Sequence, residues 1–257
     1  MEILEKNNSR LFVFTDLDDT LFQSTKKVGC NGYITATINA EGLPYAYSSI
    51  QQQKLLQVLV NSGGILIPVT GRRTSSFLNC QLPLIINSPF AIVSHGAVIL
   101  NDDYVLVDEW FSYLKQQFNL SQWEEKLTIL CKALSIDFAE IDSGIRVRLI
   151  IDQGITAYIC IKIPKESYKK GESINVNRIL KSRLAGDMSL HNNGRNFAIL
   201  PPYAKKKMAV NFIKEKMMIN ECDTVFGIGD SYSDLPFMKD TDFLIVPSSA
   251  QILKEAK

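Results

Sequence analysis

The chain contains few of the residues that mark disulfide-bonded, zinc-binding or highly charged proteins. It has five cysteines, which are scattered and form no C-x-x-C pair, and only two histidines. This pattern argues against a disulfide framework and a zinc site, and it indicates free thiols in a reducing compartment. The formal net charge is +1, so the sequence gives no indication of a nucleic-acid partner.

Long hydrophobic runs are missing as well. The most apolar stretch, residues 148–164, is interrupted by Asp152, Gln153 and Gly154 and is typical of two strands and a turn. The first ten residues are polar, carry charges of both signs and do not have the pattern of a signal peptide. We therefore expect a cytoplasmic protein with no membrane partner.

Short apolar segments alternate with helical patterns toward both ends of the chain. We expect strands at residues 11–15, 65–70, 91–94, 223–228 and 243–246, and helices at 49–61 and 204–218. This alternation is typical of an α/β fold with a Rossmann-like parallel sheet and right-handed crossovers. Residues 28–48 are expected to form a hairpin flap, with Ala40-Glu41-Gly42 as its turn.

The middle of the chain has a different order of elements. We expect two helix-strand-strand sets, at residues 121–135, 145–151 and 155–163, and at 173–185, 187–191 and 196–200. This order predicts an α+β insert whose helices cover one face of a sheet. The predicted domains are therefore an α/β core formed by residues 1–100 and 201–257, and an α+β domain formed by residues 101–200.

The most specific motif is Asp16-Leu17-Asp18-Asp19-Thr20, which follows the first predicted strand. Residues i and i+2 of a strand point to the same side, so Asp16 and Asp18 can face one site. Ligands of open α/β sheets bind beyond the carboxyl ends of the strands, and crowded carboxylates with a phosphate favour Mg²⁺. One carboxylate can attack phosphorus while the other exchanges protons with the leaving group and water.

Two further segments can contribute to a phosphate site. Thr70-Gly71-Arg72 follows a strand, where a hydroxyl and backbone N–H groups near glycine suit phosphate, although a plain turn has the same composition. Lys206 lies in the first turn of the predicted helix 204–218, and helical spacing places it above the buried stripe of that helix. We therefore choose Lys206 as the cation that offsets phosphate charge, with Lys205 and Lys207 as alternatives.

The last motif, Gly227-Ile228-Gly229-Asp230-Ser231-Tyr232-Ser233-Asp234, follows another predicted strand. Asp230 can supply a further oxygen ligand to a metal. Asp234, one turn later, can hold Lys206 or a metal-bound water in place, or it can simply cap a helix.

In this order the four segments resemble the four motifs of the haloacid dehalogenase superfamily. The Ser94-His95-Gly96-Ala97 step is similar to the point where one branch inserts a cap domain. That branch contains the Cof-like sugar phosphatases, sucrose-phosphate phosphatases and phosphomannomutases. Three positions depart from its pattern: Asp19 stands where Gly is frequent, His95 where Asn is usual, and Ser233 where Asn often occurs.

The resemblance implies a role for each motif residue. Asp16 would be the nucleophile and Asp18 the general acid/base, while Thr70, Gly71 and Lys206 would hold the phosphoryl group. Mg²⁺ would bind to Asp16, the backbone carbonyl of Asp18, and Asp230. A small phosphate ester would be the substrate, contacted also by Arg72 and by residues of the insert. The candidates in the insert are Arg146, Arg148, His191, Asn192, Asn193 and Arg195, and an Arg fork there could bind a second phosphate or a carboxylate.

We therefore expect a Mg²⁺-dependent phosphatase that hydrolyses a small phosphate monoester, most simply a sugar phosphate, through a phosphoaspartate. Two alternatives remain open: a phosphomutase of the same superfamily, and a non-catalytic protein that binds phosphometabolites. The sequence does not predict an oligomeric state.

Overall fold

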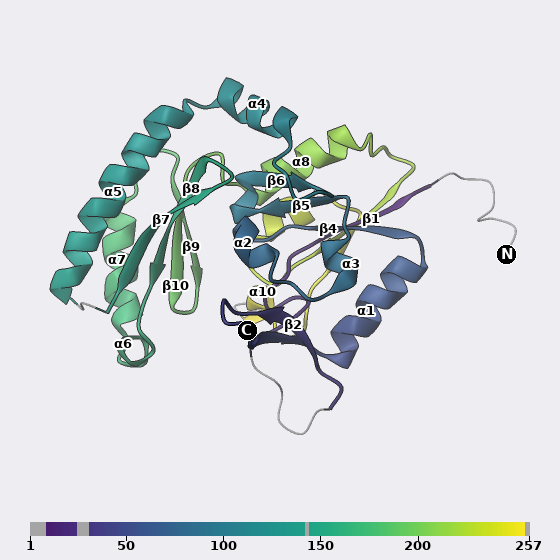
Figure 1. The fold of residues 1–257 in the computed structure, drawn as a ribbon, viewed down its shortest axis with the longest axis horizontal. Helices are drawn as coiled ribbons and strands as arrows, with labels where there is room; N and C mark the ends of the chain where they lie inside the picture. The colour runs from purple at the N-terminus through teal and green to yellow at the C-terminus, as the bar shows by residue number, and fades with distance from the viewer. Residues whose placement is uncertain (1–8, 25–30, 142–143, 255–257) are drawn as a thin grey trace, which may run out of the picture. The chain divides into compact units, whose positions relative to one another are not determined.

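The computed structural model describes residues 9–24, 31–141 and 144–254 (Figure 1). The chain divides into two compact units. We call Met1–Val105 together with Lys206–Lys257 the core unit, and Leu106–Lys205 the insert unit. The division falls a few residues beyond the domain boundaries predicted from the sequence.

The core unit is built on a parallel sheet. Its strands are β1 (Leu11–Thr15), β4 (Gly64–Pro68), β11 (Thr224–Ile228) and β12 (Phe243–Ile245), in the order β12-β11-β1-β4. Phe12, Val13 and Phe14 of β1 are fully buried, as expected for a central strand with both faces covered. The apolar run therefore forms the middle of the sheet.

Helices complete the core unit. The two long ones are α1 (Ile50–Asn61), which buries Leu56 and Leu59, and α8 (Lys206–Lys216). Ser49 caps α1 in a capping box with Gln52, whose side-chain amide also donates to the carbonyl of Thr20 at 3.0 Å. The short elements are α2 (Thr74–Phe77), α3 (Pro83–Ile86), the 3₁₀ turn η1 (Ser94–Gly96), α9 (Leu235–Met238) and α10 (Gln251–Lys254).

Two hairpins also belong to the core unit. The first joins β2 (Ile34–Ile38) to β3 (Pro44–Ser48), and its turn is closed by the Asn39 side chain, which accepts from the N–H groups of Glu41 and Leu43. The second joins β5 (Phe90–Val93) to β6 (Val98–Asn101). A parallel bridge between Val69 and Ile92 places the second hairpin beside the end of β4.

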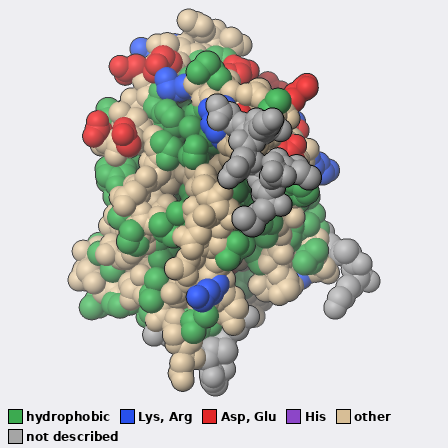
Figure 2. Space-filling view, turned by 90° about the vertical axis from the view of Figure 1, so that its right-hand side faces the viewer, with side chains coloured by type: hydrophobic (Ala, Val, Ile, Leu, Met, Phe, Trp, Pro, Cys, Tyr) green, Lys and Arg blue, Asp and Glu red, His purple; other side chains and the backbone are tan. Residues whose placement is uncertain are grey.

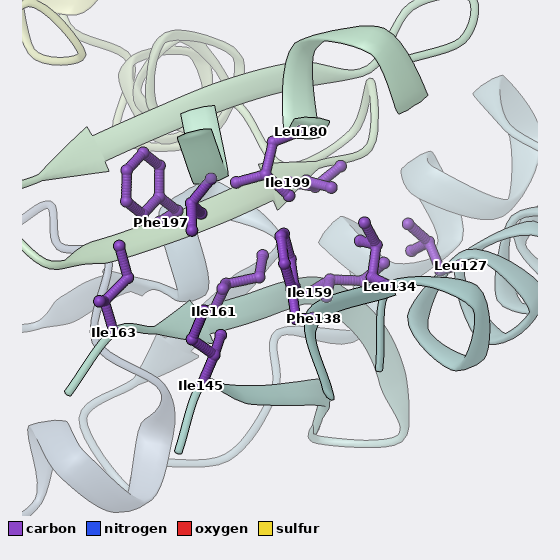
Figure 3. Close-up of a cluster of buried hydrophobic side chains, with 11 residues drawn as sticks. Leu127, Leu134, Phe138, Ile145, Ile159, Ile161, Ile163, Leu180, Phe197 and Ile199 are labelled. Carbon is purple, nitrogen blue, oxygen red and sulfur yellow. The ribbon is translucent and has the colours of Figure 1, made fainter. Parts of the chain in front are cut away.

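The insert unit is an antiparallel sheet covered by helices on one face. Its strands are β7 (Arg146–Asp152), β8 (Ile155–Lys162), β9 (Ser189–Asn193) and β10 (Asn196–Leu200), in the order β7-β8-β10-β9. Its helices are α4 (Asp108–Gln117), α5 (Leu120–Ile141), α6 (Lys165–Lys169) and α7 (Glu172–Arg183). Figure 3 shows side chains of α5 and α7, such as Phe138 and Leu180, in one cluster with Ile159 and Ile199 of the sheet.

The predicted fold class is confirmed: a parallel α/β core and an α+β insert with two helix-strand-strand sets. The sequence patterns shortened α5 and missed β6 and several helices: α4, α6 and the short α2, α3, α9 and α10. The predicted flap is present as β2 and β3, while residues 28–30 at its start lie outside the described residues.

The sequence has a small net charge and no long hydrophobic run, and the surface and the helices of the structure show the same two features. On the face in Figure 2, the Lys and Arg side chains that the structure describes are few and scattered among apolar and polar groups. None of the helices formed by the described residues combines the length and the apolar character that a membrane crossing requires.

Candidate active site

The four motifs meet at the carboxyl edge of the core sheet because of the register of its strands. Thr15, the last residue of β1, pairs with Ile228 of β11 and with Pro68 of β4. The Asp16 N–H then donates to the carbonyl of Ile228 at 2.8 Å, and the Val69 N–H donates to that of Thr15 at 2.8 Å. The residues that follow β1, β4 and β11 therefore start at the same level of the sheet.

A buried ammonium joins two of the predicted carboxylates. Lys206 Nζ donates to Asp16 Oδ1 at 2.6 Å and to Asp234 Oδ1 at 2.7 Å. All three residues are buried, with the side chain of Asp234 fully enclosed. Lys206 has this position because it is the first residue of α8, whose buried stripe continues through Ala209 and Val210. The choice of Lys206 over its neighbours matches the geometry, since Lys205 is exposed and Lys207 pairs with Asp240.

Asp234 is fixed by its own loop. Its Oδ2 accepts from the N–H of Ser231 at 3.0 Å and from the Ser231 hydroxyl at 2.7 Å. The Gly229 backbone packs against it so closely that a Cβ on Gly229 would lie 2.5 Å from the Cβ of Asp234. With both oxygens engaged, Asp234 holds Lys206 in place and closes one side of the cluster.

Asp230 and Thr20 complete the polar group. Thr20, the last residue of the first motif, is buried, and its hydroxyl is 3.4 Å from Asp16 Oδ2 and 3.5 Å from Asp230 Oδ1. Within the described residues, Asp16, Asp230 and Asp234 offer carboxylate oxygens that lie within 4.8 Å of one another. Asp16 and Asp230 thus face a common point.

The electrostatics of this cluster are unbalanced. Burial raises the pKa of Asp16 well above its ordinary value, against the opposing effect of the Lys206 ammonium. Burial, reinforced by Asp234 and Asp19, raises the pKa of Asp230 to about 6. Burial also opposes ionisation of Asp234, but Lys206 and Ser231 outweigh it, so the pKa of Asp234 is lowered. The single positive charge of Lys206 cannot balance the negative charges of all three carboxylates.

The donor set fits a hard divalent cation. If Asp16, Asp230 and Asp234 are ionised, three carboxylates against the one ammonium of Lys206 leave two negative charges uncompensated. Oxygen ligands from one or two carboxylates are what Mg²⁺ takes in proteins, together with phosphate oxygens and water. Because the oxygens of Asp234 are taken by Lys206 and Ser231, Asp16 and Asp230 are the carboxylates suited to hold it.

Arg72 contacts another residue of the site. Its guanidinium makes a bidentate ion pair with Asp18, with Nε–Oδ2 and Nη2–Oδ1 both at 2.7 Å. The same guanidinium lies over the ring of Phe22, 4.9 Å from its centroid, and donates to the carbonyl of Ser76 at 3.3 Å. The sequence pointed to Arg72 only as a substrate contact, whereas the structure joins it to the predicted acid/base.

The Thr70-Gly71 segment is supported from behind by η1. The N–H of His95 donates to the carbonyl of Thr70 at 3.1 Å, and that of Ser94 donates to the carbonyl of Arg72 at 2.7 Å. The His95 ring lies on Gly71, where an added Cβ would be 2.4 Å from Cε1. Glycine is needed here for this close approach. Thr70 is buried, and its hydroxyl oxygen accepts from the Arg72 N–H at 3.1 Å.

Backbone conformation accounts for two departures from the superfamily pattern. Asp19 and His95 both have a φ of 58°, in the left-handed region. Asp, Asn and His occupy that region more readily than other residues with a side chain. The substitution of Asp for Gly and of His for Asn therefore keeps the two turns. Ser233, the third departure, has its hydroxyl 2.8 Å from that of Ser231.

The predicted site residues fall into two groups. The core unit brings Asp16, Lys206, Asp230 and Asp234 together, with Asp18, Thr70, Gly71 and Arg72 on the adjacent loops. Arg195 lies in the insert unit, in the turn between β9 and β10, where its Nη1 is 3.5 Å from the carbonyl oxygen of Ile163.

Three groups of the site had no predicted role: Thr20, Ser231 and the His95 ring. Thr20 belongs to the first motif and Ser231 to the last. A hydroxyl residue so close in sequence to the aspartates of a motif could have been predicted to hydrogen-bond to their carboxylates. The contact of His95 with Gly71 had no comparable signal in the sequence.

A parallel sheet that gathers these motifs at its carboxyl edge, interrupted by an α+β insert, is the arrangement of haloacid dehalogenase superfamily hydrolases. Comparison with known families identifies the branch. The sequence model described as sucrose-6F-phosphate phosphohydrolase matches residues 9–253, so the chain belongs to that family. It is accordingly a phosphoric monoester hydrolase, and the superfamily prediction is confirmed.

Solved structures share the fold at low sequence identity. The sucrose-phosphatase of Synechocystis sp. PCC6803, in complex with sucrose and phosphate, is similar with a TM-score of 0.57 and 14% identity, over 96% of this chain and 87% of that one. The Plasmodium falciparum IMP-nucleotidase is similar with a TM-score of 0.55 and 11% identity, over 96% and 67% of the two chains.

A third solved structure, the C-terminal domain of the C. albicans trehalose-6-phosphate phosphatase, has a TM-score of 0.52 and 17% identity, over 90% of this chain and 73% of that one. No curated protein matches the sequence.

Proposed function

We propose that this hydrolase is a Mg²⁺-dependent sugar-phosphate phosphatase that works through a phosphoaspartate on Asp16. The observation that carries the proposal is the buried ammonium of Lys206 between Asp16 and Asp234, next to Asp230. A sugar phosphate is supported by the family and by the sucrose and phosphate named for the similar Synechocystis enzyme. A cytoplasmic location remains a prediction from the sequence.

In the first step an oxygen of Asp16 attacks phosphorus, and the bond to the leaving oxygen breaks. Asp18 enters this step protonated, with one oxygen released from the Arg72 ion pair, and donates its proton to the leaving oxygen. Lys206, held by Asp234, offsets the charge on the phosphoryl oxygens, and the Thr70-Gly71 segment offers a hydroxyl and N–H groups to them. Mg²⁺, when bound by Asp16, Asp230 and the Asp18 carbonyl, would reduce the repulsion between nucleophile and phosphate.

In the second step Asp18 takes a proton from water, whose oxygen attacks phosphorus. The bond between phosphorus and Asp16 breaks, which releases inorganic phosphate and restores the carboxylate. Asp18 therefore acts first as acid and then as base. Its carboxylate is exposed enough for both exchanges, with 44% of the side chain accessible, and Arg72 fixes its orientation.

The test is phosphate release from a panel of sugar phosphates with Mg²⁺, with excess chelator, and with the variant Asp16→Asn. We expect release that needs Mg²⁺ and no bisphosphate activator, and no release by Asp16→Asn. Asp102→Asn, at an exposed aspartate of the same unit, is the matched control and should remain active. Undiminished turnover in chelator or in Asp16→Asn would reject the proposal, and a requirement for a bisphosphate would indicate a phosphomutase.

A further inference from the structure

The sheet of the insert unit has two different faces. Ile159 and Ile161 of β8 and Phe197 and Ile199 of β10 point into the cluster under α5 and α7 (Figure 3). Because successive strand residues point to opposite sides, the residues between them occupy the other face. That face carries cations: Arg146 and Arg148 on β7 and Lys162 on β8.

The register brings like charges together on this face. Arg146 pairs directly with Lys162, and Lys162 pairs on its other side with Asn196 of β10. Directly opposed residues of antiparallel strands have Cβ atoms about 4.5–5.5 Å apart, and like charges there destabilise the sheet. The arrangement thus costs the folded chain stability.

Arg195 adds a fourth cation to this row. It follows Gly194, whose φ of 58° lets the chain turn in two residues between Asn193 and Asn196. The Ile163 N–H donates to the Arg195 carbonyl at 2.9 Å, and Arg195 Nη1 is 3.5 Å from the Ile163 carbonyl oxygen. These two contacts hold Arg195 next to Lys162, the residue that precedes Ile163.

Among the described residues, no acidic side chain forms an ion pair with a cation of the row. In the described part of the insert unit, the ion pairs are Lys169–Glu166 and Arg183–Asp137, and neither includes a cation of this row. Burial, followed by Arg195, Arg146 and Arg148, lowers the pKa of Lys162. Each of the three arginines is therefore close enough to Lys162 to repel its ammonium.

We propose that Arg146, Arg148, Lys162 and Arg195 form a binding site for a small organic anion that carries a phosphate or carboxylate group. Such a group supplies the charge that the row lacks, and an Arg fork binds either one through two parallel hydrogen bonds. A nucleic acid fits less well, because the whole chain has a net charge of only +1 and the row covers one end of a short sheet.

The first experiment measures binding to the full chain without divalent metal, using inorganic pyrophosphate as the probe and backbone amide shifts as the readout. We expect saturable shifts at residues 146–148, 160–162 and 194–196. Arg146→Gln and Lys162→Gln should each weaken binding there about tenfold, the size of one charge-assisted hydrogen bond. Lys132→Gln removes an exposed cation from α5 and is the matched control, with unchanged binding.

The same variants also separate a binding role from a structural one. Since Arg146 and Lys162 repel each other, Arg146→Gln should unfold at a midpoint no lower than the parent protein in anion-free buffer. Pyrophosphate should then raise the midpoint of the parent more than that of Arg146→Gln. Shifts confined to the core unit, or binding by both row variants that is as tight as in the parent protein, would overturn the proposal.

A kinetic experiment, which rests on the proposed function, tells whether the bound anion belongs to the substrate. It compares glucose 6-phosphate, whose leaving group is uncharged, with glucose 1,6-bisphosphate. If the anion belongs to the substrate, Arg146→Gln should raise KM about tenfold for the bisphosphate alone. If KM for the bisphosphate is the same in Arg146→Gln and in the parent protein, and the pyrophosphate shifts are observed, the site binds an anion that is separate from the substrate. Because the shift experiment needs no turnover, its failure is distinct from a failure of the proposed function.

Discussion

Arg72 and Asp18, which lie on the loops after two neighbouring strands, form a bidentate ion pair with both N–O distances at 2.7 Å. The pair fixes the direction of the carboxylate that we assign as general acid and base. Arg72 is itself held by the Phe22 ring and the Ser76 carbonyl. We therefore regard Arg72 as a residue that positions Asp18.

Arg72→Gln should impair leaving-group protonation more than phosphate binding. We expect kcat for alkyl phosphates, whose leaving groups need a proton, to fall about tenfold or more, within the range of general acid catalysis. p-Nitrophenyl phosphate, whose leaving group departs without a proton, should be affected much less. Arg73→Gln, at the exposed neighbour, is the control. An equal loss for both substrates would contradict the positioning role.

Lys206 should be needed for both rate and stability. Lys206→Met leaves Asp16 and Asp234 buried without their cation, so we expect a loss of about 3–5 kcal/mol in the free energy of unfolding. Lys206→Arg keeps the charge but changes its shape, and kcat should fall on the order of 10²-fold while the fold is retained. Urea unfolding and steady-state kinetics measure the two effects. Lys207→Met, at an exposed lysine, should change neither kcat nor the free energy of unfolding by much. If the variants of Lys206 and Lys207 lost similar amounts of activity and stability, Lys206 would have no special role.

The contact between Gly71 and His95 predicts a non-additive pair. Gly71→Ala places a Cβ 2.4 Å from the His95 ring and should destabilise the protein by about 1–3 kcal/mol. His95→Asn removes the ring and keeps a side chain that accepts left-handed φ values. The double variant should therefore lose less stability than the sum of the single changes. Additive losses in a double-mutant cycle would show that the ring does not require glycine at this position.

Asp223 should make stability depend on pH. Its carboxylate accepts from the Arg10 N–H at 3.0 Å, from Arg10 Nε at 3.1 Å and from the Asn220 N–H at 3.1 Å, and hydrogen bonding to Arg10 lowers its pKa. A lowered folded-state pKa gives stability that is present above the unfolded value of about 3.9 and is lost as the pH falls below it.

Asp223→Asn should therefore lower the unfolding midpoint at pH 7, and its difference from the parent should shrink below about pH 4. Denaturant unfolding across this pH range is the measurement, with Glu221→Gln at an exposed neighbour as the control. A constant difference at all pH values would show that the effect does not come from ionisation of Asp223.

The sequence predicts the frame of the site because strand alternation and strand ends are local properties. Two of the site residues, Asp16 and Asp230, follow strands with a clear apolar pattern, and Lys206 lies at the start of a helix with such a pattern. The expected parallel sheet therefore predicted that the three side chains lie close together. The Asp18–Arg72 pair could not be predicted in this way, since it joins residues 54 positions apart through side chains whose direction depends on packing.

Conformations set by packing were also missed. The left-handed turn at Ser94 and His95 carries no glycine signal, yet it places the His95 ring on Gly71. The register of Arg146 against Lys162 depends on how the two strands pair, so the sequence could name Arg146 as a candidate contact but could not indicate that Lys162 lies opposite it. Local pattern thus gives the elements and the motif positions, while the partners of each side chain come from tertiary structure.

The proposed mechanism requires that Asp16 becomes phosphorylated during turnover. Acid quenching of the enzyme within a single turnover, followed by peptide mass analysis, measures it directly. We expect a phosphoryl group on the peptide that contains Asp16, formed in step with leaving-group release and absent in Asp16→Asn. A phosphoryl group on another residue, or turnover of Asp16→Asn at the parent rate, would contradict it.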